Sequence, residues 1–374
     1  MSSTDAGAEA SGLLAHKATS ALIALCIVVF VGLVVAAGIR ASASGELGAT
    51  LLHSLWQLDD RELLLRWGAL APARIWLDGD WWRLLTAGLL HGSWLHLALN
   101  MSGLWVVGQW VERAWGPWRM LLLFTLSSVG GCLASLAWAE APLVVGASAG
   151  IFGIAGALVV GRAWGREAIQ DALEPISAAR LAGWLAFWLV LGFGLPLLGV
   201  SVLAQAGHLG GLAVGAALGW ASSRPEKQRL FGYGAWGLTV CALSAAAFHG
   251  ATPRARFNDD LFIALDLLER GRGDEAVPHL ESLLDREPDD PSLANDVAYF
   301  LALEGVELTW AEELVGVAIA DDPENANYLD TLGWIQCRLG LGEVGLETLG
   351  EARELGAGIE EVGEHIMLCG VVGD

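Results

Sequence analysis

Seven long apolar stretches constrain how this chain of 374 residues can fold more than any other feature. Crossing the hydrocarbon core of a bilayer takes about 20 predominantly apolar residues in a helix. The stretches of about this length cover residues 21–39, 90–110, 118–139, 146–163, 180–200, 204–222 and 231–249. Because backbone N–H and C=O groups cannot bond to water inside lipid, spanning segments fold as helices. The sequence therefore predicts an all-α, polytopic membrane helix bundle over residues 21–250.

The first apolar stretch allows two interpretations. A polar tail, residues 1–20, precedes it, as in a signal peptide. The stretch is long for the apolar part of a signal peptide, however, and Gly38, Ile39 and Arg40 make a poor cleavage site. We therefore expect a retained membrane helix.

The few charged residues are unevenly distributed along the chain. Residues 1–250 hold 14 acidic and 14 basic side chains, whereas residues 251–374 hold 28 acidic and only 7 basic ones. The formal net charge of −21 thus belongs to the C-terminal part. This division predicts a neutral membrane domain followed by an acidic soluble domain. An acidic surface argues against direct binding to nucleic acid or to anionic lipid headgroups.

Loop charges indicate how the bundle is oriented. Basic residues occur in loops 111–119, 162–180 and 223–229, whereas the alternate loops 139–146 and 199–205 contain neither Lys nor Arg. Because basic loops stay in the cytoplasm, the N-terminus is predicted inside. The long loop 40–89 and everything after the seventh span are then outside. This arrangement suits a bacterial cytoplasmic membrane.

A repeating pattern begins after the last apolar stretch. Residues 287–302 superpose on residues 322–337 at a shift of 35, which matches Asn295 to Asp330 and Tyr299 to Trp334. Helix pairs that recur near every 34 residues resemble tetratricopeptide repeats. The predicted domain covers residues 259–374 and follows a linker at 251–258. Its three units cover 259–290, 291–325 and 326–358.

The repeat domain has two interpretations, because a helical solenoid is either a plain stable scaffold or a surface that binds peptides. We expect a peptide or protein partner, either a substrate or an adaptor.

The cysteines do not show metal-ligand spacing, and we expect neither a metal nor another cofactor. Cys26, Cys132 and Cys241 lie in apolar stretches and are interpreted as packing residues. Cys337 and Cys369 lie in the acidic part, where they either form a disulfide, if their compartment is oxidising, or remain free.

Polar side chains inside the apolar stretches are the main functional candidates, because such residues are expensive in a membrane. His91, His96 and Asn100 occur in "HGSWLHLALN", Ser148 in "GASAGIFG" and His208 in "AGHLGGLAVG". Each one alone is often only a hydrogen-bonding contact between helices. In the predicted topology, however, all of them lie near the outer ends of their spans.

Glycines recur at helical spacing near two of these residues. Gly207, Gly211, Gly215 and Gly219 form one stripe, and Gly146, Gly150, Gly153 and Gly156 form another. Small residues at this spacing let two membrane helices approach closely. If the stripes face each other, the imidazole of His208 reaches Ser148 and can act as its base. His96 and Asn100 share one helix face, and with the Ser148 N–H they suit a developing oxyanion.

These motifs, together with "WWR" at 81–83 and "VERAWG" at 111–116, resemble those of the rhomboid family of intramembrane serine proteases. The resemblance covers about residues 60–220 and implies a six-helix core, here followed by a seventh helix. It implies Ser148 as nucleophile and His208 as general base. It also implies supporting roles for His96, Asn100, His91, Gly146 and Phe152.

The resemblance implies intramembrane endopeptidase activity on single-span or membrane-edge protein substrates in the bilayer. One departure is Ala149, where the family most often has glycine. Two alternatives remain. An inactive relative that escorts membrane proteins usually lacks the serine or the histidine, and both are present. A transporter using a polar relay usually has acidic residues or lysine inside its spans, and these stretches have none.

Overall fold

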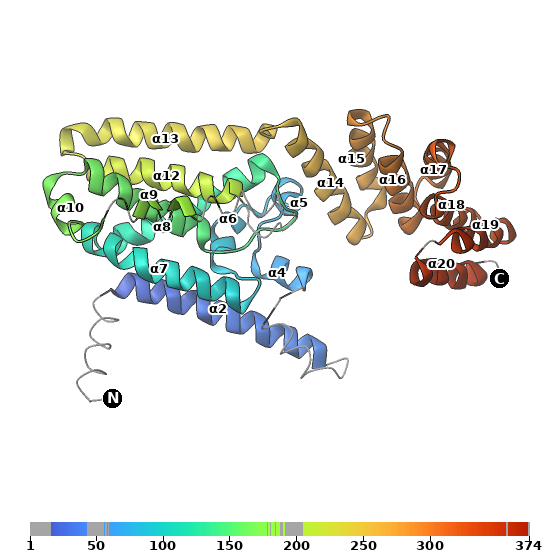
Figure 1. The fold of residues 1–374 in the computed structure, drawn as a ribbon, viewed down its shortest axis with the longest axis horizontal. Coiled ribbons are helices and arrows are strands. Elements are labelled where there is room, and N and C mark those ends of the chain that lie inside the picture. The colour runs from blue at the N-terminus through green and yellow to red at the C-terminus, as the bar shows by residue number, and fades with distance from the viewer. Residues whose placement is uncertain are drawn as a thin grey trace. The chain divides into compact units, whose positions relative to one another are not determined.

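The computed structural model describes residues 16–42, 56, 58, 60–177, some positions between 179 and 190, 205–356 and 358–372. The chain divides into two compact units, residues 1–256 and 257–374 (Figure 1). The predicted all-α fold is confirmed, because the described residues form helices and connecting loops with only an isolated antiparallel bridge between Leu70 and Val144. The predicted tail 1–20 and the predicted span 180–200 lie largely outside the described residues.

The first unit is a helix bundle with short helices in its long loop. Its long helices are α2 (Lys17–Ser42), α7 (Trp94–Trp115), α8 (Pro117–Trp138), α9 (Ser148–Trp164), α12 (Gln205–Ser223) and α13 (Glu226–His249). The shorter elements are α4 (Arg61–Trp67), α5 (Pro72–Trp76), α6 (Arg83–Thr86), the 3₁₀ helix η1 (Ala87–Leu89) and α10 (Glu167–Ala172).

The first unit belongs to a multi-pass membrane protein. Within the described ranges, three helices are long and apolar enough to cross a bilayer: Lys17–Arg40, Pro117–Trp138 and Glu226–His249. The share of the apolar window that is buried is 72% in α8 but only 11% in α13, so α8 is central and α13 peripheral. Helix α9 is apolar but shorter than these three helices, and α7 and α12, which carry His96, Asn100 and His208, are not among the three. The count of seven spans therefore stays a prediction.

Helix α12 lies between α9 and α8 at backbone contact distance. A Cβ atom added to Gly211 or Gly215 would overlap a main-chain carbonyl oxygen of α9, that of Ala149 or that of Gly153. Toward α8, a Cβ on Gly210 would lie 2.6 Å from the carbonyl oxygen of Gly130. Lipid gives no hydrophobic drive between helices, so association depends on this close van der Waals packing.

The glycine stripes pair differently from the prediction. Gly211 and Gly215 face α9, but they meet Ala149 and Gly153 rather than a continuous glycine stripe. Gly150 instead faces Phe124 and Ser128 of α8, where a Cβ would lie 2.6 Å from the ring. The reason is that α9 packs closely against α8 as well as against α12, so small residues are required on two of its faces.

The loop between α2 and α7 is held by Arg83. Its guanidinium donates hydrogen bonds to the carbonyl oxygens of Leu65, at 2.6 Å, and Ala69, at 3.0 Å. It also pairs with Asp80 at 2.8 Å, and the Thr86 hydroxyl donates to the Gly68 carbonyl at 2.8 Å. A buried arginine with three acceptors thus joins α4 to α6 at the edge of the bundle.

Helix α2 is attached through Glu112 near the end of α7. The Glu112 carboxylate accepts hydrogen bonds from the Ala18 N–H at 3.1 Å, the Thr19 N–H at 3.0 Å and the Thr19 hydroxyl at 2.9 Å. A carboxylate favours the positive end of a helix dipole and satisfies its free N–H groups. The first residues of α2 therefore lie beside the last turn of α7.

The second unit is a succession of helices. They are α14 (Pro253–Glu269), which crosses the boundary between the units, α15 (Gly273–Arg286), α16 (Pro291–Glu304), α17 (Leu308–Asp321), α18 (Ala326–Arg338), α19 (Gly342–Leu355) and α20 (Ile359–Val372). Helix α14 begins inside the stretch predicted as a linker, because Pro253 suits a first helical turn. The assignment to tetratricopeptide repeats stays a prediction.

Helix α20 lies beyond the third predicted repeat and is joined to α18. Cys337 and Cys369 form a disulfide with their Cα atoms 5.3 Å apart. Nearby, His365 bonds to Asp330 at 3.0 Å and its ring stacks on Trp334 at 4.9 Å between centroids. The open question of whether these cysteines pair is therefore answered by a covalent link between the two helices.

The contact between α12 and α9 predicts the effect of one methyl group. We expect Gly215→Ala to lower the free energy of unfolding by about 1–3 kcal/mol, because its Cβ would overlap the backbone of α9. Gly237→Ala is the matched control, since nothing lies within 4 Å of a Cβ at this position of α13. Unfolding of the purified protein in detergent micelles measures both variants. Equal stability of the two variants would contradict the packing argument.

Candidate active site

Ser148 is held by the loop that connects α8 to α9. Gly146 has φ +126°, a backbone conformation that residues other than glycine rarely adopt. Its N–H donates to the Ala87 carbonyl at 3.0 Å, and Val144 pairs with Leu70 across the isolated bridge. The loop is thereby fixed to the segment before α7. Ser148 follows as the first residue of α9, where backbone N–H groups lack partners within the helix.

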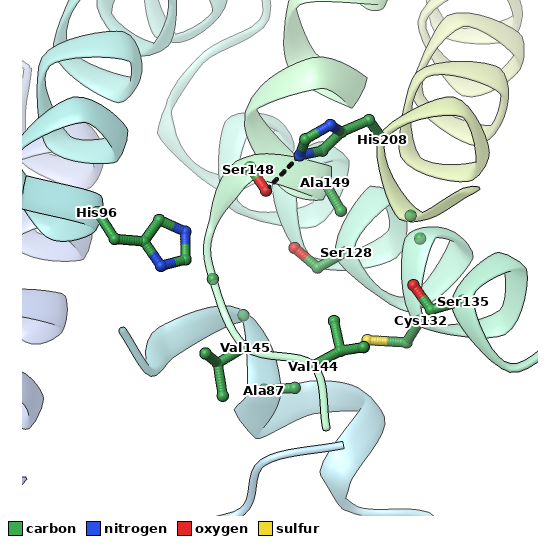
Figure 2. A pocket seen from close by; sticks show the side chains of 14 residues that line it. Ala87, His96, Ser128, Cys132, Ser135, Val144, Val145, Ser148, Ala149 and His208 are labelled. Carbon is green, nitrogen blue, oxygen red and sulfur yellow. Dashed lines mark hydrogen bonds between the residues drawn. The ribbon is translucent and has the colours of Figure 1, made fainter. Parts of the chain in front are cut away.

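The imidazole of His208 contacts the Ser148 hydroxyl. Nε2 of His208 lies 2.8 Å from Oγ of Ser148 (Figure 2). His208 is in the first turn of α12 and only 5% of its surface is exposed. The ring of Phe152, one turn after Ser148, stacks on the imidazole with centroids 4.5 Å apart and planes 11° from parallel. The serine, its candidate base and the ring that orients the base therefore come from two adjoining helices.

Within the described ranges, no carboxylate bonds to the other ring nitrogen of His208. Nδ1 is buried without a hydrogen-bond partner among the described residues. The start of α12 is held instead by Glu140, whose carboxylate accepts the Ala206 N–H at 2.9 Å. In a catalytic triad a third polar residue positions the imidazole. Here the packing of Phe152 and the helix cap by Glu140 position it instead.

His96 and Asn100 lie against Gly146, two residues before the serine. A Cβ on Gly146 would be 2.8 Å from Nε2 of His96 and 3.8 Å from Nδ2 of Asn100. The hydroxyl of Ser93 accepts the His96 N–H at 3.1 Å and so caps α7. His91 is completely buried and its ring lies 5.1 Å from that of His96, edge to face.

A cavity of about 60 Å³ opens beside the Ser148 hydroxyl (Figure 2). Among the predicted site residues, Ser148, His208, His96 and Gly146 line it, whereas Asn100, His91 and Phe152 do not. The full lining is Ala87, Gly88, His96, Ser128, Gly131, Cys132, Ser135, Val144, Val145, Gly146, Ser148, Ala149, Gly207 and His208. The volume is enough for a few waters or a small side chain.

One wall of the cavity comes from α8, which the sequence reasoning did not connect with the site. Ser128, Cys132 and Ser135 form this wall (Figure 2) together with Gly131. Cys132, interpreted above as a packing residue only, is buried but also lines the cavity. One signal in the sequence could have indicated this wall: these small and polar residues follow one another at intervals of three, one and three residues, which puts them on one side of a helix. Glu140 was missed too, although it is the acidic residue of a loop without basic ones.

The site gathers three helix N-termini. His96, Ser148 and His208 each lie within the first four residues of their helices α7, α9 and α12. The positive ends of these helix dipoles favour negative charge between them. A hydroxyl, a neutral base and N–H donors around one small cavity are the requirements of acyl transfer. No grouping of three or more potential metal ligands occurs in the described part of the chain.

Comparison with known proteins relates this part of the chain to a family. Residues 78–225 match the family described as "Rhomboid domain". The chain contains a domain of the rhomboid family.

Three relatives illustrate the extent of the similarity. Rhomboid protease GluP of Bacillus subtilis is 30% identical over 277 residues, 71% of this chain and 51% of the relative. Rhomboid protease AarA of Providencia stuartii is 35% identical over 119 residues, 28% of this chain and 42% of the relative. Rhomboid protease GlpG of Haemophilus influenzae is 29% identical over 160 residues, 42% of this chain and 79% of the relative. The chain spans about half the length of the first relative.

The stacked ring in the rhomboid domain predicts a change in serine reactivity. We expect Phe152→Leu to slow labelling of Ser148 by a fluorophosphonate up to about tenfold, because an aromatic contact worth about 0.5–1.5 kcal/mol no longer orients His208. Phe248→Leu is the matched control, since that ring packs on Trp76 at 5.3 Å instead. In-gel fluorescence over time gives both rates. An unchanged rate in Phe152→Leu would show that the stacking does not position the imidazole.

Proposed function

We propose that the rhomboid domain is a serine endopeptidase that cleaves membrane-embedded or membrane-edge segments of single-span proteins. The observation that carries the proposal is the 2.8 Å contact between Nε2 of His208 and Oγ of Ser148 beside a small buried cavity. The match of residues 78–225 to the rhomboid domain, and the relatives named as rhomboid proteases, support the same reaction class.

The proposed reaction uses Ser148 and His208 in turn. Oγ of Ser148 attacks the carbonyl carbon of the scissile bond while Nε2 of His208 takes its proton. The tetrahedral intermediate collapses, the C–N bond breaks, and His208 gives the proton to the leaving amine. A water molecule, deprotonated by the same imidazole, then hydrolyses the acyl-enzyme and regenerates the serine.

The oxyanion formed in both steps needs donors near the start of α9. The N–H of Ser148 belongs to the unpaired first turn of that helix, and His96 lines the same cavity. Nδ2 of Asn100 also lies near Gly146, 3.8 Å from an added Cβ, but Asn100 does not line the cavity, so we expect its amide to support the donor group without facing the cavity. We assign these three residues to oxyanion stabilisation, with His91 holding His96 by ring contact.

We propose that the site opens on the outer side of a bacterial cytoplasmic membrane, with the N-terminus inside. The basic stretch 111–119 covers the end of α7 and the start of α8, and 223–229 covers the end of α12 and the start of α13, both at the bundle end away from Ser148. The chain leaves the membrane unit at the Ser148 end, since the Ala251 N–H donates to the Ala137 carbonyl at 2.7 Å near the end of α8. The positive-inside rule then puts the site and residues beyond 251 outside.

The proposed activity predicts which single changes abolish cleavage. With a reporter single-span substrate expressed in the same cells, we expect Ser148→Ala and His208→Ala to give no product. His96→Ala should lower the rate by about 10²–10³, the usual effect of losing one oxyanion donor. Immunoblotting of the cleaved fragment measures these changes.

Ser223→Ala is the control, because that serine lies at the far end of α12 and bonds to the Gly219 carbonyl. A chain whose Ser148 neither labels with a fluorophosphonate nor cleaves any reporter would instead be an inactive factor that binds or escorts membrane proteins.

We further propose that the second unit, residues 257–374, binds a substrate or adaptor protein on the outer side. The acidic excess of residues 251–374 favours a basic partner segment. The disulfide between Cys337 and Cys369 suits an oxidising compartment outside the cytoplasm.

A chain ending at residue 256 tests this role. We expect it to keep fluorophosphonate labelling of Ser148 and to lose cleavage of a subset of cellular substrates, because capture and chemistry reside in different units. Quantitative proteomics of released fragments, against full-length and Ser148→Ala chains, measures the difference. An unchanged substrate range would remove the binding role.

A further inference from the structure

The residue after the candidate nucleophile contributes a methyl group to the cavity wall. Ala149 lines the cavity between the dyad and α8 (Figure 2). Its Cβ sits directly over Gly131, because a Cβ added to Gly131 would overlap it. The methyl group therefore occupies space that a glycine at position 149 would leave to the cavity.

The wall around Ala149 cannot easily yield. Its carbonyl oxygen is pressed against Gly211 of α12, where an added Cβ would overlap it. On the other side, a Cβ on Gly131 would also lie 2.7 Å from the carbonyl oxygen of Gly207. The backbones of α8 and α12 thus hold Ala149 in place. Because protein interiors are closely packed, Ala149 cannot move aside to enlarge the cavity.

The position of the cavity determines which part of a substrate enters it. When Oγ of Ser148 attacks a carbonyl carbon, the oxygen turns toward the donors near Gly146 and His96. The leaving amine turns toward His208. Ala149 and Cys132 lie across the cavity from His96 (Figure 2), so we expect the side chain on the acyl side of the bond to face them and the neighbouring Gly131.

The volume of the cavity limits that side chain. A cavity of about 150 Å³ accepts benzene, whereas this one measures about 60 Å³. It therefore has room for a small aliphatic side chain and none for an aromatic ring. Removing one methyl group from its wall would therefore enlarge the cavity by a large fraction of its volume.

We propose that Ala149 is a specificity-determining residue: its methyl group sets the upper size of the substrate side chain on the acyl side of the scissile bond. This inference rests on the proposed endopeptidase function. Ala149, which stands where the family most often has glycine, then affects which substrates are selected rather than how fast they are turned over.

The experiment compares kcat/KM for one reporter substrate carrying Ala, Val, Leu or Phe at that position. In Ala149→Gly, we expect the ratio of Val to Ala cleavage to rise about tenfold or more, since one methyl group in a pocket changes discrimination by about 10- to 200-fold. Ala149→Ser, which adds one heavy atom, should lower the same ratio.

Ala155→Gly is the matched control. It removes the same methyl group from the same helix, and Ala155 is completely buried but does not line the cavity. Its Val to Ala ratio should equal that of the wild type, even where a glycine in α9 lowers stability and absolute rate.

Fluorophosphonate labelling of Ser148 in every variant separates the two proposals. A wild-type chain that neither labels nor cleaves overturns the endopeptidase function and this inference with it. A wild-type chain that cleaves, with Ala149→Gly showing the wild-type ratio or Ala155→Gly showing the same shift, overturns only the role of Ala149.

Discussion

The close approach of α12 to α9 is the contact on which the candidate site depends. At Gly211 and Gly215 the two backbones touch without any side chain between them. Only at this separation does an imidazole in the first turn of α12 reach a hydroxyl in the first turn of α9. The hydrophobic effect does not drive helices together in lipid, so this close packing also stabilises the helix bundle.

The same arrangement explains how the hydroxyl and the imidazole pair without a carboxylate from the part of the chain that the structure describes. Phe152 stacks on the ring, and Glu140 caps the helix that carries it. Both devices restrict His208 without placing a second charge in a buried site, where an ionised group is expensive. The convergence of three helix N-termini then supplies the positive potential that an oxyanion requires.

Much of this site could be predicted from the sequence. Polar residues in apolar stretches are rare enough to single out Ser148, His208 and His96, and glycines four apart indicate a close helix pair. The partners of the glycines could not be predicted, because spacing shows which residues share a face but not which neighbour that face meets. For the same reason the α8 wall, with Gly131 and Cys132, was missed.

The sequence by itself determined that the chain is helical, that its first part enters a membrane, and which side chains are candidates for chemistry. These follow from local properties: run length, charge, and the expense of polar groups in lipid. Only the tertiary structure decided that Gly150 faces α8, that Asn100 does not line the cavity, and that Ala149 borders it. Such facts depend on the rotation and depth of each helix against two neighbours, and many different rotations satisfy the same spacing of small residues.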